Sequence, residues 1–274
     1  MIAATTLLAI ISITRARFLM GTVCEIRAAN ETQIAAAFDE AARVESMIST
    51  WRSDSELSTG RYSPELAALI RVVEQWRDKT GGAFEPRIRP LIDAWKTRGD
   101  GAVPDAATIA RALDEIRNRT ASIEEGGFGK GYALDRMLTK IDGDAVLNFG
   151  GQILVRGSAP VTIANPLHRD RAIVSLTLKD ASLSTSSGSE KSFAMNGRRF
   201  THIIDPRTGE ALPPRGSVSV ISSDATTADI LSTALYVMGP DEGLRWADQH
   251  GVAALFIDEA VRPSRAFPQF ERMK

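Results

Sequence analysis

This sequence has little of three things that often identify a protein's class: cysteine, net charge and aromatic side chains. Cys24 is the only cysteine, so the chain can form neither an internal disulfide nor a CxxC metal site. A buried, unreactive thiol is the favoured interpretation, and an intermolecular bridge stays open as the alternative. The net charge of −1 gives no sign of a nucleic-acid or anionic-membrane partner, because acidic and basic residues are spread along the chain.

The composition is that of a folded protein with a full core. The chain has 274 residues, of which 43% are hydrophobic and 24% charged, which suffices for one large domain or two lobes. It contains no internal repeat and no low-complexity linker. Aromatic residues make up only 6%, so an aromatic in a polar segment, such as Trp51, needs an explanation.

The first thirteen residues are apolar apart from threonine and serine, but they are too short to cross a bilayer as a helix. They resemble the apolar core of a signal peptide, although the basic segment and the small-x-small cleavage site are missing. An atypical export signal over residues 1–16 and a plain first strand are both compatible with this pattern. We expect a periplasmic or cell-envelope location, with the cytoplasm as the open alternative.

Hydrophobic periodicity divides the chain into a mainly helical first half and a mainly strand-forming second half. This order favours an α+β or mixed α/β architecture over a doubly wound parallel sheet. Helices are predicted at residues 32–49, 64–80, 105–118, 132–141, 227–238 and 241–250. Strands are predicted at residues 18–28, 145–147, 153–156, 161–164, 173–178, 200–204, 218–222 and 252–257.

Residues 224–233 place two carboxylates and four hydroxyls within ten positions. If a helix begins near Ala228, then Asp229, Ser232 and Thr233 share one helical face. Hard oxygen ligands on one face suit Mg²⁺ or Ca²⁺. The alternative is that the aspartate only caps the helix N-terminus.

Three other segments carry candidate chemistry, each with a plainer alternative. The glycine-rich run 124–132 leads into a helix and includes Lys130, which favours an anionic ligand, although a tight turn explains it as well. His202 is one of three histidines and suits proton transfer near pH 7, or it is a core histidine. Trp51 lies in a polar segment, where it can stack on a flat heterocycle or fill a gap in the core.

Eight segments, in order, resemble the ApbE family of FAD:protein FMN transferases over nearly the whole chain from Arg17 on. No single segment is decisive, but chance is an improbable explanation for eight in family order. They are FLMGT (18–22), STWRSDSEL (49–57), GGAFEP (81–86), PLIDAW (90–95), GKGYALD (129–135), LNFGG (147–151), HIIDPRTG (202–209) and ADILST (228–233).

The resemblance implies a two-lobed fold over residues 17–274, with a mixed sheet and a flavin cleft between the lobes. It implies a Mg²⁺-dependent enzyme that binds FAD and joins its FMN half through a phosphoester to a threonine or serine of an acceptor protein, releasing AMP. The acceptor would be a subunit of a membrane redox complex or another flavoprotein. Some members instead hydrolyse FAD to FMN and AMP.

The resemblance also implies roles for individual residues. Asp229, Ser232, Thr233 and the backbone carbonyl of Gly127 match the metal-binding positions. The FAD-binding positions are matched by Met20, Trp51, Ala83, Phe84, Glu85, Glu124, Lys130 and Ile203. Asp229 is the expected catalytic metal ligand, and His202 is slightly favoured over a nearby carboxylate as the group that accepts the acceptor's proton.

The chain departs from the family pattern at three carboxylates. Glu85 and Glu124 stand where the family usually has aspartate, and Glu125 replaces an apolar residue. These changes put FAD affinity in question rather than the reaction type. Three other functions remain open: an FAD pyrophosphatase, a flavin carrier without turnover, and a purely structural domain.

Overall fold

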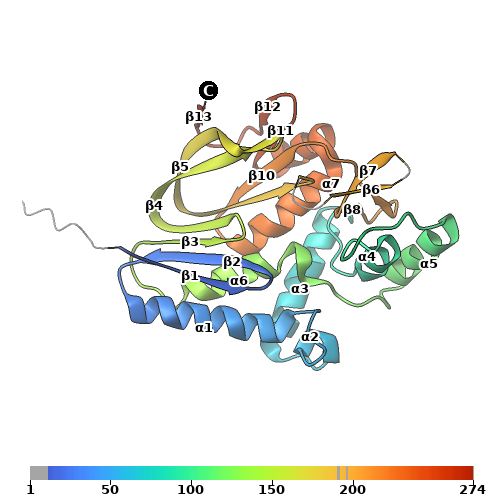
Figure 1. The fold of residues 1–274 in the computed structure, drawn as a ribbon, viewed down its shortest axis with the longest axis horizontal. Coiled ribbons are helices and arrows are strands. Elements are labelled where there is room, and N and C mark those ends of the chain that lie inside the picture. Colours follow the sequence, from blue (N-terminus) through green and yellow to red (C-terminus); the bar gives the residue numbers. More distant parts are fainter. Residues whose placement is uncertain (1–11, 190–191, 196, 274) are drawn as a thin grey trace, which may run out of the picture.

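The computed structural model describes residues 12–189, 192–195 and 197–273 (Figure 1). The expected export signal at residues 1–16 therefore falls largely outside the described part of the chain. Among the described residues, no helix combines the length and apolar character that crossing a membrane would need.

A nine-stranded sheet forms the centre of the molecule, and eight of its strands follow the order β1-β2-β3-β4-β5-β10-β11-β12, with β13 paired to β5. The α+β class is confirmed, but the expected mixed sheet is wrong, because all described pairings are antiparallel. Short turns at residues 20–21 and 150–151 join neighbouring strands, and such turns permit only antiparallel pairing. The strands are β1 (Ile13–Leu19), β2 (Thr22–Ala28), β3 (Ala145–Phe149), β4 (Gln152–Asn165), β5 (His168–Ser187), β10 (Ser217–Ser222), β11 (Ala253–Ile257), β12 (Val261–Pro263) and β13 (Glu271–Arg272).

Helices α1 (Glu31–Ile48), α6 (Gly129–Leu138) and α7 (Ala225–His250) pack against one another and against the sheet, and α3 (Pro64–Lys79) joins the same core (Figure 1). The short helix α2 (Glu56–Thr59) follows α1. The main core lies between these helices and the sheet, and a second apolar cluster lies among β4, β5 and β11.

Helix α7 begins at Ala225, two residues before the predicted start at 227. Asp224 caps it by accepting a hydrogen bond from the Thr227 amide at 2.7 Å, and Asp135 accepts from the amides of Ala225 and Thr226. The two helices predicted at 227–238 and 241–250 are continuous apart from a break at Gly239, where φ is 76° and ψ is 175°. The capping alternative is therefore confirmed for Asp224, the first carboxylate of the segment, whereas Asp229 lies inside α7 and does not cap it.

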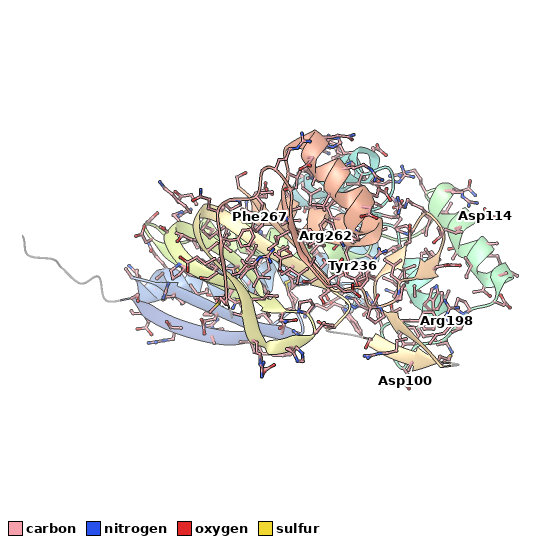
Figure 2. All side chains as sticks on the ribbon, turned by 90° about the horizontal axis from the view of Figure 1, so that it is seen from above. Asp100, Asp114, Arg198, Tyr236, Arg262 and Phe267 are labelled. Atoms are coloured by element: carbon pink, nitrogen blue, oxygen red, sulfur yellow. The ribbon has the colours of Figure 1, made fainter. Side chains whose placement is uncertain are left out.

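A smaller lobe packs beside the sheet, and we call it the small lobe. It consists of α4 (Arg89–Trp95), α5 (Ala106–Arg117) and the strand pairs β6 (Ser192–Met195) with β7 (Arg198–Thr201) and β8 (Ile204–Asp205) with β9 (Glu210–Ala211). Trp95 and Phe200 meet in its own apolar core, with ring centroids 5.2 Å apart. Figure 2 shows the labelled Asp114 and Arg198 in this lobe and Phe267 over the large sheet.

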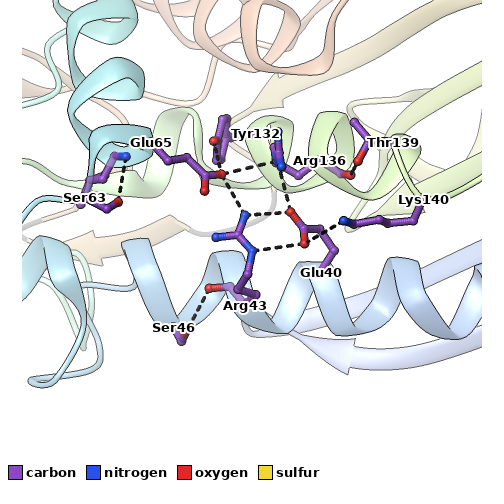
Figure 3. Close-up of polar contacts among 10 residues, drawn as sticks. Glu40, Arg43, Ser46, Ser63, Glu65, Tyr132, Arg136, Thr139 and Lys140 are labelled. Carbon is purple, nitrogen blue, oxygen red and sulfur yellow. Dashed lines mark hydrogen bonds and ion pairs between the residues drawn. The ribbon is translucent and has the colours of Figure 1, made fainter.

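A network of charged side chains joins α1, α3 and α6 (Figure 3). Glu40 lies at its centre and is only 7% exposed. Its carboxylate pairs with Arg43 at 2.7 Å, Arg136 at 3.2 Å and Lys140 at 3.6 Å. Hydrogen bonds from Arg43, which outweigh the cost of burial, lower the pKa of Glu40 to about 2. Two carboxylates, Glu40 and Glu65, meet three cations in this network, so the charge of Glu40 is compensated within the protein.

Candidate functional site

The cavity that contains Asp229 has a volume of about 190 Å³ and is lined by both lobes, and we call it the main cavity because it holds the predicted metal site. The sheet and α7 supply one side, including Ser184, Asp229 and Thr233, and the segment around β8 supplies the other, including His202 and Ile203. The expected cleft therefore brings together residues that are far apart in the sequence.

Three buried carboxylates line this cavity; Glu85 and Glu124 are paired with arginines, whereas Asp229, 5% exposed, has no ion pair among the described residues. Its Oδ2 accepts a hydrogen bond from the Gly131 amide at 3.1 Å. Burial raises the pKa of Asp229, while the nearby charge of Lys130 and the Gly131 amide act in the opposite direction. An under-compensated anion in a cavity fits a bound cation, because the cation would supply the missing charge.

Glycine at position 131 is what lets α6 approach α7 so closely. A Cβ at this position would lie 2.3 Å from the Ala225 carbonyl oxygen and 2.9 Å from the Asp229 Cβ. No other residue type fits there without moving one helix. This contact fixes Lys130 next to Asp229 and explains the glycine-rich run in the sequence.

The other predicted ligands differ in their placement. A Cβ on Gly127 would lie 3.5 Å from the Thr233 Oγ1, so the two residues are neighbours in the cavity wall. The Thr233 hydroxyl donates to the Asp229 carbonyl oxygen at 3.2 Å. A carboxylate, a carbonyl and a hydroxyl form an all-oxygen donor set of the kind that Mg²⁺ accepts. Among the described residues no group of three or more His, Cys, Asp or Glu side chains could hold a metal ion, so this set, with its single carboxylate, is not such a group.

Ser232 does not line this cavity. Its hydroxyl is fully buried and lies 2.9 Å from the Ser186 Oγ and 3.2 Å from the Ser184 Oγ. The same hydroxyl donates to the Asp229 carbonyl oxygen at 3.0 Å, so Ser232 lies behind the cavity wall that Ser184 and Ser186 line. The helical spacing correctly placed Thr233 with Asp229, but it could not show that serines of strand β5 form hydrogen bonds with Ser232.

A second cavity of about 490 Å³ adjoins the first and shares Glu124, Gly126 and Lys130 with it. Met20 and Trp51, both predicted flavin contacts, line it. Met20 occupies the left-handed region with φ at 46°, an uncommon conformation for a side chain of this size. Its amide donates to the Glu45 carboxylate at 3.1 Å, which stabilises this turn beside the cavity.

The remaining predicted flavin contacts all line the main cavity: Ala83, Phe84, Glu85 and Ile203. Glu85 also has structural partners, since Arg77 pairs with it at 2.8 Å and the Arg87 amide donates to it at 2.9 Å.

The predicted strand 200–204 is wrong at its centre. Strand β7 ends at Thr201 and β8 begins at Ile204, because the Thr201 hydroxyl takes a hydrogen bond from the Ile203 amide at 3.1 Å. His202 therefore lies in a loop. The alternation of side chains along a strand therefore does not set the direction of the His202 side chain. His202 nevertheless lines the main cavity.

Sequence reasoning missed several polar residues of the site. Ser184, Thr185 and Ser186 on β5 line the main cavity, and the serine-rich run 182–189 was their only signal. Gln152 also lines it; its Nε2 donates to the Ala225 carbonyl at 2.7 Å. The Gln152 Oε1 is buried without a hydrogen-bond partner among the described residues, so it is free to accept a hydrogen bond.

Comparison with known proteins gives a family for this fold and site. The ApbE family model matches residues 20–256. An FAD:protein FMN transferase of Klebsiella pneumoniae is 28% identical over 78% of this chain and 78% of its own length. An FAD:protein FMN transferase of Rhodobacter capsulatus is 34% identical over 68% of this chain, which corresponds to 42% of that protein.

Solved structures agree with the sequence comparison. The ApbE protein of Thermotoga maritima superposes with a TM-score of 0.85 at 26% identity, covering 93% of this chain and 97% of that one. The apo flavinyl transferase ApbE of Pseudomonas stutzeri has the same fold, with a TM-score of 0.83 at 22% identity over 93% of this chain and 95% of its own. The chain belongs to the ApbE family.

Proposed function

We propose that this protein is an FAD:protein FMN transferase that depends on Mg²⁺, modifies a threonine or serine hydroxyl of an acceptor protein and releases AMP. The proposal depends on one observation: two helices and a glycine turn place four residues in the wall of one cavity, namely Asp229, Thr233, Gly127 and Lys130. The names of the relatives support the transferase class.

We propose Asp229, the Gly127 carbonyl and the Thr233 hydroxyl as the cation ligands. Ser232, the fourth residue that the resemblance implies, lies outside the cavity, and we propose that it supports the site without binding the cation. When bound, Mg²⁺ would neutralise the diphosphate of FAD and stabilise the leaving phosphate of AMP. Lys130 adds positive charge at the junction of the two cavities. Asp229 positions the cation, and its hydrogen bond from Gly131 fixes the direction of its carboxylate.

In the proposed reaction the acceptor oxygen attacks the phosphorus of the FMN phosphate. The bond from that phosphorus to the bridging oxygen breaks, and AMP leaves with this oxygen. The acceptor's proton passes to a base at the cavity, for which we propose His202. Glu85 and Glu124 line the same cavity but accept hydrogen bonds from arginine side chains, which makes them weaker candidates.

Two cavities that meet at shared residues support a ligand with two ring systems joined by a diphosphate. Met20 and Trp51 line one cavity and Phe84 and Ile203 the other. Gly126 and Lys130 line both cavities, so the charged diphosphate of such a molecule would fit beside them. Glu85 and Glu124, each one methylene longer than aspartate, line the main cavity.

Mass spectrometry tests the proposal directly. We would incubate candidate acceptor proteins, such as a membrane redox subunit, with this protein, FAD and Mg²⁺, and map the modified residue by peptide sequencing. A mass gain equal to an FMN phosphoester on threonine or serine, together with free AMP, is expected. AMP release with FAD and no acceptor would instead support a pyrophosphatase, and unchanged FAD after long incubation would contradict both enzymes.

We also propose export to the periplasm or cell envelope, on the basis of the apolar residues 1–13. Fractionation of cells that express the full chain, followed by N-terminal sequencing, tests this. Recovery in the periplasm or envelope is expected, whereas an intact protein in the cytoplasm would contradict it.

A further inference from the structure

Arg98 makes an unusual set of contacts at the junction of the two cavities. It lies in the turn between α4 and α5, where the Ala102 amide donates to the Trp95 carbonyl at 2.8 Å. The Trp95 indole in turn donates to the Gly209 carbonyl at 2.8 Å inside the small lobe. The backbone that carries Arg98 is therefore anchored in the small lobe, while its side chain reaches the other lobe.

The Arg98 guanidinium lies over one face of the Trp51 ring, 4.3 Å from its centroid. Trp51 is nevertheless 68% exposed, so its other face is open to ligand. The contact is of the cation–π type, which is strongest for tryptophan, and the flat guanidinium can stack as well. Arg98 thus supports the aromatic ring from behind.

The same guanidinium contacts Glu124 and Thr50. Its Nη2 donates to the Glu124 Oε1 and to the Thr50 hydroxyl. Thr50 in turn donates to Glu125 through its hydroxyl at 2.6 Å and through its amide at 3.1 Å. Arg98 therefore contacts the buried Glu124 directly and the adjacent buried Glu125 only through Thr50, and Arg89 lies 3.7 Å from Glu124.

We propose that Arg98 is a positioning residue for the nucleotide, which fixes the Trp51 ring and the Glu124 carboxylate at the junction of the cavities. A planar nucleotide ring would stack on the free face of Trp51. Glu124 would accept a hydrogen bond from a hydroxyl or amino group of the same ligand. This inference rests on the proposed function, since FAD supplies both groups.

The fixed arrangement lowers the cost of binding. A free Trp51 side chain and a free Glu124 side chain would each lose rotamer freedom when the ligand orders them. Arg98 has already ordered both before the ligand arrives. Lysine cannot replace it, because one ammonium group cannot stack on the ring and serve two oxygen acceptors with the same geometry.

The first test is equilibrium binding without turnover. Isothermal titration in EDTA would measure the Kd of FAD, FMN and AMP for wild type, Arg98→Met and Arg98→Lys. We expect Arg98→Met to raise the Kd of FAD about tenfold, with Arg98→Lys recovering little of the loss. Whichever of FMN and AMP loses affinity identifies the ring that stacks on Trp51.

Arg52→Met is the matched control, because it removes the same charge one residue from Trp51. Arg52 pairs with the exposed Asp54 at 2.9 Å, and we expect its replacement to change the Kd by less than about twofold. Thermal unfolding of each variant checks that the fold is intact. A Kd for Arg98→Met within twofold of wild type would overturn the positioning role.

A second test needs no ligand. In protein labelled with 5-fluorotryptophan, the Trp51 signal is the one that Trp51→Phe removes, and Arg98→Met should shift or broaden that signal alone among the four. An unchanged Trp51 signal contradicts the stacking contact. If wild type binds none of the three nucleotides, the proposed function fails as well, whereas wild-type binding with an unaffected Arg98→Met variant removes only the positioning role.

Discussion

Glu40 and Asp229 are two buried carboxylates that contact the same helix, α6, and have opposite electrostatics. Glu40 meets Arg43 of α1, Arg136 near the end of α6 and Lys140 just beyond α6, and hydrogen bonds from Arg43 and then Arg136 lower its pKa to about 2. Asp229 receives one amide hydrogen bond at the start of α6, and burial raises its pKa. One site has its charge compensated by the protein itself, and the other does not.

The difference separates what stabilises this molecule from what equips it to bind. The cations around Glu40 leave no negative charge for a ligand to compensate, so the Glu40 network adds to the free energy of unfolding. A carboxylate with a raised pKa in a cavity costs stability and is typical of functional sites. Helix α6 joins the two regions, because its first residues border the cavity and Tyr132, Arg136 and Lys140 border the network (Figure 3).

The largest expected effect is the loss of transfer on neutralising the cavity carboxylate. Asp229→Asn should lower the rate of FMN transfer by at least about 10³-fold, on the order of 4 kcal/mol in the barrier, because the cation loses its charged ligand. Transfer to the acceptor is the assay, and EDTA should inhibit wild type to the same extent. Full transfer in metal-free buffer would reject the role of Asp229.

The network carboxylate should show the reverse behaviour. Glu40→Gln should reduce the free energy of unfolding by about 1–3 kcal/mol, less than a fully buried pair, because Arg43, Arg136 and Lys140 are 41%, 37% and 38% exposed. FMN transfer below the melting temperature should not change. Urea unfolding measures the loss, and Asp39→Asn, at an exposed neighbouring position, is the control.

The pH dependence of stability should differ in sign between the two sites. The pKa of Glu40 falls from 4.5 to about 2 on folding, so its contribution is complete above pH 4.5 and is lost as the pH falls to 2. The raised pKa of Asp229 makes its ionisation unfavourable in the metal-free fold, so its cost is absent below pH 3.8 and grows as the pH rises.

Melting temperatures from pH 2 to 7 in EDTA separate these two contributions. Glu40→Gln should flatten the loss of stability between pH 4.5 and 2. Asp229→Asn should be at least as stable as wild type at pH 7. A less stable Asp229→Asn variant at that pH would show that the aspartate is paired within the protein after all.

The smallest expected effect concerns the hydroxyl that lies off the cavity. Ser232→Ala should cost about 1 kcal/mol of stability, because the Ser186 and Ser184 hydroxyls lose a partner, and should change Mg²⁺ affinity less than about threefold. Thr233→Val should weaken Mg²⁺ by about tenfold. Calorimetric titration of Mg²⁺ decides, and a tenfold loss in Ser232→Ala would restore Ser232 as a ligand.

The hydrophobic periodicity of the sequence predicted helices well where a helix buries one face and exposes the other. The helix predicted at 32–49 is α1 at Glu31–Ile48, and that predicted at 105–118 is α5 at Ala106–Arg117. Strands predicted at 153–156 and 161–164 form one strand, β4, because the pairing with β5 shifts register between Val155 and Ser158. Gly157 and Pro160 look like a turn in the sequence, and only the partner strand accommodates them.

The sequence by itself determined the composition of the site: a carboxylate and hydroxyls one helical turn apart, a lysine between glycines, and an aromatic in a polar loop. These features are local, and helical spacing alone brings Asp229 and Thr233 together. Tertiary structure decided which of these groups share a cavity, since Ser232 faces strand β5 and Arg98 reaches Trp51 from the other lobe. Such contacts depend on how distant segments pack, and spacing along one chain segment carries no information about them.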